Sequence, residues 1–68
     1  MKSEINIKFG QSVAKVRNSR HLSQEELADK CGLHRTYIGI IERGEKSPTL
    51  ETMNKIALGL EIPLKDLL

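Results

Sequence analysis

Apolar side chains recur along the chain at steps of three and four residues, the spacing of one face of an α-helix. Phe9, Val13 and Val16 share such a face and predict a first helix over about Ile5–Ser19. Strict alternation of apolar and polar residues, which would indicate a β-strand, is absent from the sequence. The pattern therefore predicts an all-α chain, in which further short amphipathic segments follow this first helix.

Two short helices joined by a tight turn are predicted in the middle of the chain. Ser23 begins the sequence S-Q-E-E, a capping box in which the serine hydroxyl and the Glu26 carboxylate each accept a backbone N–H. This second helix ends at Cys31, and Gly32 follows as a left-handed terminator. A third helix is predicted over Arg35–Arg43. The apolar positions expected to be buried on this pair and its turn are Leu27, Ala28, Cys31, Leu33, Tyr37, Ile38 and Ile41.

The last third of the sequence predicts two more helices. Gly44 ends the third helix, and Thr49 caps a fourth that runs from Leu50 to about Gly59. Pro63 suits the first turn of a last short helix. The apolar residues expected on these two segments are Leu50, Met53, Ile56, Ala57, Leu60, Leu64, Leu67 and Leu68. Residues 1–68 thus predict a single domain, a compact five-helix bundle around one small core.

Composition excludes several classes of protein. The chain has one cysteine, Cys31, so neither a disulfide nor a four-cysteine zinc site is available. This cysteine usage predicts a reduced, cytoplasmic location. No apolar run approaches the ~18 residues needed to span a bilayer, and no signal peptide is evident. Phosphate-binding glycine loops and nucleophile–base sets are also absent, so we expect neither an enzyme, a cofactor nor a small-molecule ligand.

The distribution of charge is more informative than the net charge of +2. Residues 1–22 carry five basic and one acidic side chain, and residues 34–47 carry three basic and two acidic ones. A polyanion is a suitable partner if the fold places these two segments side by side. The alternative is an ordinary solvated surface of mixed charge.

The central helix pair has the features that a helix-turn-helix requires. In such a pair the second helix lies in the major groove of DNA, where base edges can be distinguished. Gly32 permits the turn, and the small Ala28 suits the crossing of the two helices. Ile38 and Ile41 anchor the third helix from behind, and its N-terminal end is polar, with the sequence H-R-T at 34–36. These features predict a helix that contacts DNA bases.

At this point the sequence resembles the Xre-type family of phage repressor and Cro-like helix-turn-helix proteins. The resemblance covers about residues 9–68 and rests on four motifs: L-S-Q-E-E-L-A at 22–28, C-G-L at 31–33, I-E-R-G at 41–44 and S-P-T-L-E-T at 47–52. The run R-T-Y-I at 35–38, followed by I-E-R, is most similar to controller proteins of restriction–modification systems. The resemblance implies a lambda-repressor-like fold.

The resemblance also implies roles for individual residues. Arg35 and Thr36 match base-contacting positions, and Gly39 and Ile40 match further positions facing the groove, where the family often has a long polar side chain. Ile40 can still contact a thymine methyl group. Five residues are predicted to contact phosphates, either because they match the family or because of their place in the sequence: Gln24, His34, Tyr37, Arg43 and Lys46. Lys46 could instead contact a base. Arg17 and Glu42 match an ion pair between the first and third helices.

Some residues have an ordinary structural alternative. His34 suits a helix cap or a solvent-facing position as well as a contact with DNA. Tyr37 is expected in the core more than at a phosphate. Cys31 and His34 are three residues apart but lack two of the four ligands that zinc needs, so we predict no metal site. Leu64, Leu67 and Leu68 form either part of the core or a dimer interface, and we favour the interface.

The sequence therefore predicts a transcriptional regulator that binds double-stranded DNA as a homodimer. One unit contacts only ~4–5 base pairs, too few for useful specificity. Two units on half-sites about 34 Å apart would bind a pseudo-palindromic operator. The alternative is a protein-interaction module on the same fold, of the antitoxin or anti-repressor type.

Overall fold

The structure, a computed structural model, describes residues 3–68. Within these residues the chain forms four α-helices and one short 3-10 helix: α1 (Glu4–Ser19), α2 (Gln24–Cys31), α3 (Arg35–Glu42), α4 (Leu50–Leu60) and η1 (Leu64–Leu67). The all-α class is confirmed, but the predicted count of five α-helices is wrong. Lys2, which contributes to the basic first segment of the sequence, lies outside the described residues.

The fifth predicted helix is a single 3-10 turn. Its bonds span three residues, since Asp66 N–H donates to the Pro63 carbonyl at 3.0 Å and Leu68 N–H donates to the Lys65 carbonyl at 3.3 Å. A segment of four residues is too short to offset the cost of nucleating an α-helix, and 3-10 geometry is common in such short pieces.

Side-chain caps define where the helices begin. Ser23 Oγ accepts the Glu26 N–H at 3.0 Å, and Glu26 Oε1 accepts the Ser23 N–H at 2.8 Å, which confirms the predicted capping box. These bonds lower the pKa of the Glu26 carboxyl. Thr49 caps α4 as predicted, and Ser3 caps α1 in the same way. Gly32 ends α2 with a φ of 70°, the left-handed conformation expected of it.

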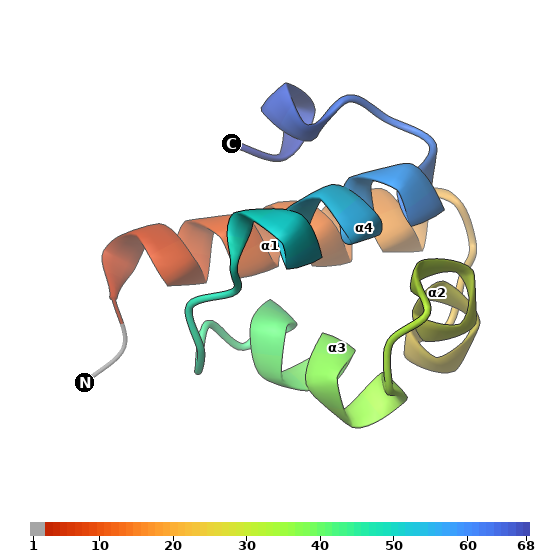
Figure 1. The fold of residues 1–68 in the computed structure, drawn as a ribbon, viewed down its shortest axis with the longest axis horizontal. Helices are drawn as coiled ribbons and strands as arrows, with labels where there is room; N and C mark the ends of the chain where they lie inside the picture. The colour runs from red at the N-terminus through yellow and green to blue at the C-terminus, as the bar shows by residue number, and fades with distance from the viewer. Residues whose placement is uncertain (1–2) are drawn as a thin grey trace.

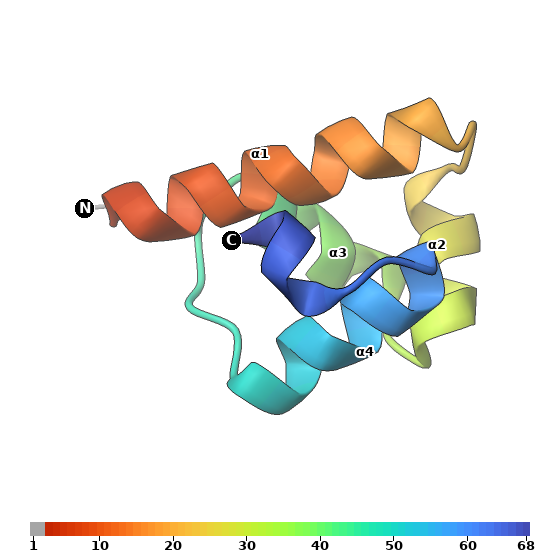
Figure 2. The same cartoon turned by 90° about the horizontal axis from the view of Figure 1, so that it is seen from above.

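The helices are arranged around one apolar core (Figures 1 and 2). In Figure 1, α1 and α4 lie across the middle of the molecule, with α3 on one side of them, η1 on the other and α2 at one end. The buried apolar side chains are Phe9, Val13, Leu27, Ala28, Cys31, Ile38, Ile41, Ile56, Ala57, Leu60 and Leu67. The core therefore draws on all five elements and leaves the far side of α3 at the surface.

Leu50 is not part of this core, which corrects the sequence prediction. Its side chain is 67% exposed. Leu50 is the first residue of α4, and Figure 2 shows that this first turn extends to the outer edge of the molecule. Helical spacing alone includes Leu50 in the apolar stripe, but no neighbouring element covers it there.

Two glycines allow helices to approach one another closely. A Cβ at Gly10 of α1 would overlap the backbone carbonyl oxygen of Ile41 and lie 2.7 Å from that of Glu42, both in α3. A Cβ at Gly59 of α4 would lie 2.5 Å from the Sγ of Cys31 in α2. The helix α4, predicted to run to about Gly59, ends at Leu60, and Glu61 follows it in the left-handed conformation.

Candidate nucleic-acid interface

The helix pair α2–α3 is joined by a short turn that is fixed by backbone bonds. Gly32 N–H donates to the Asp29 carbonyl at 3.4 Å, and Leu33 N–H donates to the Ala28 carbonyl at 3.0 Å. Ala28 is 1% exposed, consistent with a small residue at the crossing of the two helices. Leu33 is half-buried and packs against the core, as expected. These contacts hold α3 at a defined angle to α2.

The two sides of α3 differ sharply in exposure. Ile38 and Ile41 are 0% and 1% exposed and hold the helix against the core. Arg35 and Thr36 are exposed at its N-terminal end. In Figure 1 this end lies on the side of the molecule opposite η1. The structure therefore presents the two predicted base-contacting residues to solvent.

His34 serves as the N-cap of α3. Its Nδ1 accepts the backbone N–H of Thr36 at 3.0 Å. In a neutral imidazole the other ring nitrogen then carries the proton and is the donor. The helix-cap alternative for His34 is thus the one found, and a phosphate contact through the remaining nitrogen stays a prediction.

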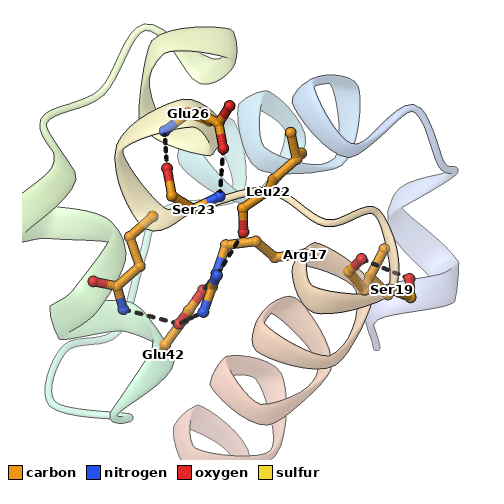
Figure 3. A network of polar contacts seen from close by, with 8 residues as sticks. Arg17, Ser19, Leu22, Ser23, Glu26 and Glu42 are labelled. Carbon is orange, nitrogen blue, oxygen red and sulfur yellow. Dashed lines mark hydrogen bonds and ion pairs between the residues drawn. The ribbon is translucent and has the colours of Figure 1, made fainter.

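A network of charged and polar side chains joins α1, α2 and α3 (Figure 3). Arg17 Nε donates to Glu42 Oε2 at 2.6 Å, and Arg17 Nη2 donates to Glu42 Oε1 at 3.1 Å. Arg17 Nη1 donates to the Leu22 carbonyl at 2.7 Å, and Gln24 Nε2 donates to Glu42 Oε1 at 3.0 Å. The Arg17 and Glu42 side chains are only 13% and 7% exposed. The predicted ion pair between α1 and α3 is confirmed, and the bond from Gln24 ties the end of α3 to the start of α2.

Gln24 and Arg43 converge over Gly39. A Cβ at Gly39 would lie 3.1 Å from Arg43 Nη1 and 3.4 Å from Gln24 Oε1. Gly39 is therefore buried under these two side chains, which argues against the direct base contact predicted for it. Ile40 is half-buried beside it. The arrangement places two predicted phosphate-contacting side chains together, one from α2 and one from the end of α3.

Both arginines of this surface are paired with carboxylates of the same chain. Arg35 Nη1 lies 2.6 Å from Glu25 Oε2 of α2. Arg43 Nε and Nη2 donate to the two carboxylate oxygens of Glu45 at 2.9 and 3.2 Å. Hydrogen bonding with Glu45, together with its negative charge, raises the pKa of the Arg43 guanidinium. These pairs were not anticipated from the sequence, because in neither pair are the two residues three or four apart, the separation at which side chains meet on a single helix.

The remaining predicted site residues divide between core and surface. Tyr37 is half-buried and packs against the core, whereas Lys46 is exposed in the loop after α3. Leu67 is 1% exposed and belongs to the core of its own chain, so it is not available to a second copy. Leu64 is half-buried, and Leu68 is 75% exposed. Of the predicted dimer residues, only Leu68 and part of Leu64 therefore lie at the surface.

Cys31 has the structural role expected of it. Its side chain is buried, and burial raises the pKa of the thiol. Among residues 3–68 there is no group of three or more histidine, cysteine, aspartate or glutamate side chains placed to hold a metal ion. Over the same residues, no helix combines the length and apolar character needed to cross a membrane.

Arg20 has a role that was missed from the sequence. Its Nε donates to the Leu60 carbonyl at 2.7 Å and so binds the C-terminal end of α4. Basic side chains commonly donate hydrogen bonds to the unpaired carbonyls at the C-terminal end of a helix, where the helix dipole is negative. Here the two residues are forty apart in the chain, so only the fold brings them together.

Comparison with known proteins identifies the family. The profile of the helix-turn-helix family matches residues 13–67. Control protein C.BamHI of Bacillus amyloliquefaciens is 46% identical over 69 residues, which cover all of this chain and 85% of the relative. Control protein C.SmaI of Serratia marcescens is 47% identical over 60 residues, which cover 88% of this chain and 71% of the relative.

Solved structures give the same result. The crystal structure of the restriction-modification controller protein C.AhdI from Aeromonas hydrophila matches with a TM-score of 0.94 and 38% sequence identity. This match covers 97% of the present chain and 100% of the other. The shared fold, the family profile and the level of identity lead to one conclusion: the chain belongs to the Xre-like helix-turn-helix family.

Proposed function

We propose that this protein is a sequence-specific DNA-binding transcriptional regulator whose helix α3 lies in the major groove. The observation that carries the proposal is the N-terminal end of α3, where Arg35 and Thr36 are exposed while Ile38 and Ile41 hold the helix from behind. A major groove admits an α-helix, and its base edges carry a distinct pattern of donors and acceptors for each base pair. The arrangement therefore suits direct recognition of sequence.

The two exposed residues have complementary chemistry. The guanidinium of Arg35 matches the O6 and N7 acceptors of guanine, the commonest specific contact of this kind. The hydroxyl of Thr36 can bond to a base, and its methyl group can contact a thymine methyl. Because Gly39 is buried and Ile40 is half-buried and apolar, Arg35 and Thr36 supply most of the polar recognition.

Groups around α3 are placed for contacts with the DNA backbone. Gln24 is the first residue of α2, where unpaired backbone N–H groups and the helix dipole favour a phosphate. Arg43 and Lys46 follow α3 and are exposed, so they suit the flanking phosphates. Such contacts fix the orientation of the protein on the duplex without selecting sequence.

The relatives suggest which genes are regulated. C.BamHI and C.SmaI are control proteins by name, and C.AhdI is a restriction-modification controller protein. The present chain covers most of each of them. On this basis we infer that it controls transcription in a restriction–modification system.

A homodimer is the form that this function requires. One 68-residue unit spans only ~4–5 base pairs, whereas two units on half-sites about 34 Å apart give useful specificity. A groove of about 560 Å³ lies between α1 and η1, and it is lined by the apolar residues Ile5, Phe9, Leu67 and Leu68 and by the polar residues Lys8, Gln11, Ser12 and Lys15. Ile5 and Leu68 are 74% and 75% exposed at its sides. Burial of Ile5 and Leu68 by a second copy would stabilise the dimer.

Replacing Arg35 by alanine is expected to relax base preference at one position of each half-site. The loss of one bidentate arginine–guanine contact costs about 1–3 kcal/mol of discrimination. Affinities for duplexes varied at each operator position, measured at fixed salt concentration, give this quantity directly. Unchanged preference at every position would show that Arg35 is not a base-contacting residue.

A further inference from the structure

The backbone turn after α3 determines the position of Glu45. Gly44 has a φ of 72° and donates its N–H to the Ile41 carbonyl at 3.0 Å. Glu45 N–H donates to the Ile40 carbonyl at 3.1 Å, and the two bonds together close a helix-terminating turn. Residues two apart on a continuous helix point to different sides. The turn is therefore what brings the Glu45 carboxylate beside Arg43.

The geometry of this pair resembles a complex with phosphate. Two nitrogens of Arg43, Nε and Nη2, donate to the two carboxylate oxygens of Glu45 at 2.9 and 3.2 Å. The same two-pronged arrangement is the one with which arginine binds a phosphate group. Glu45 thus occupies the Nε–Nη2 edge of the guanidinium, one of the edges through which Arg43 could bind a DNA phosphate.

The ion pair between Arg43 and Glu45 is also exposed enough to solvent for its side chains to separate. The side chains of Arg43 and Glu45 are 55% and 40% exposed. Ion pairs at such exposure are weakened by water and salt, and they contribute little to stability. The carboxylate can therefore be replaced by another anion without disturbing the core.

We propose that Glu45 is an internal competitor of DNA: it binds the Nε–Nη2 edge of the Arg43 guanidinium in the free protein and must release that edge when a phosphate binds there. This inference rests on the proposed function. The exchange reduces the net contribution of Arg43 to the free energy of DNA binding. The reduction is the same for every DNA sequence, so it weakens non-specific binding. Because the exchange offsets part of the positive charge that Arg43 brings to the phosphate, it also lowers the net number of counterions released when DNA binds.

The other arginine pair of the surface differs in geometry. Arg35 contacts Glu25 through a single nitrogen, Nη1, at 2.6 Å. One prong of its guanidinium is engaged by the carboxylate, and the pairing does not use the Nε–Nη2 edge. Arg35 can therefore contact a base while it remains paired with Glu25, whereas Arg43 must leave Glu45 to bind a phosphate with the same edge.

Replacing Glu45 by glutamine tests this inference. The probe is a 20-base-pair duplex of mixed sequence, and its dissociation constant is measured over a range of salt concentrations. The Glu45→Gln variant is expected to bind about two- to fivefold more tightly, the range that corresponds to an exposed ion pair. Its salt dependence is expected to be steeper by up to about one unit. Glu61→Gln is the matched control, since it removes the same charge from the end of α4, away from α3.

A second pair of variants separates competition from simple repulsion. Loss of a negative charge near DNA raises affinity by itself, so the Glu45→Gln gain is measured again in an Arg43→Ala background. Competition predicts that the gain is at least twofold smaller there than in the wild type. Equal gains in both backgrounds would overturn this inference alone. If the wild-type chain showed no salt-dependent binding to DNA, the proposed function and the inference that rests on it would both be wrong.

Discussion

Replacing Arg17 by methionine is expected to lower the free energy of unfolding by about 3–5 kcal/mol, because it leaves the carboxylate of Glu42, whose side chain is only 7% exposed, without its charged partner. Two of the three side-chain hydrogen bonds of Glu42 come from Arg17. The third comes from the side-chain amide of Gln24, which is uncharged. A domain of this size has a modest total stability, so the variant should be close to unfolding at room temperature.

A double variant distinguishes the charge effect from a loss of packing. Buried ion pairs replaced by apolar side chains of similar volume are often as stable as the original. Arg17→Met/Glu42→Met should therefore recover most of the stability that the single variant loses. Urea denaturation followed by circular dichroism measures both values. A single variant within about 1 kcal/mol of the wild type would show that the pair behaves as an exposed ion pair.

Replacing Gly10 by alanine is expected to cost about 2–3 kcal/mol, even though alanine favours a helix by about 1 kcal/mol over glycine. The added Cβ would overlap the Ile41 carbonyl oxygen and approach that of Glu42 to 2.7 Å. These are backbone atoms in the last turn of α3, so α1 and α3 must move apart. The same movement would displace the ion pair between Arg17 and Glu42.

Gly39→Ala is the matched control for this substitution. Gly39 also lies within a helix, but the atoms nearest its added Cβ belong to the side chains of Arg43 and Gln24, which can move aside. Its stability should be unchanged or rise by up to about 1 kcal/mol, the helix-propensity difference. If Gly10→Ala were as stable as Gly39→Ala in thermal denaturation, the close contact of α1 with α3 would be disproved.

Local signals in the sequence were sufficient for most of the fold. The capping box at Ser23, the cap at Thr49 and the left-handed Gly32 depend on neighbouring residues alone, and all three are confirmed. Leu50 was misjudged because its exposure depends on which helix lies next to it. The apolar stripe does not show where the covering elements end.

The main residues of the candidate site were predictable from the family resemblance, but their carboxylate partners were not. The family motif places Arg35 and Thr36 at the front of α3, and the exposed position of both is observed. The Arg17–Glu42 pair followed from the same resemblance and is also observed. The carboxylates of Glu25 and Glu45 beside the two arginines were not foreseen. Their contacts arise from the crossing of α2 on α3 and from the turn at Gly44, which no local pattern describes.

Selection of bound sequences from a random DNA pool, at a stated salt concentration, tests the central claim most directly. If the start of α3 enters the major groove as part of a dimer, the selected duplexes should share two inverted half-sites of ~4–5 base pairs, with centres about 34 Å apart. Binding that depends on salt but enriches no common sequence would contradict this account, since phosphate contacts alone would then explain the affinity.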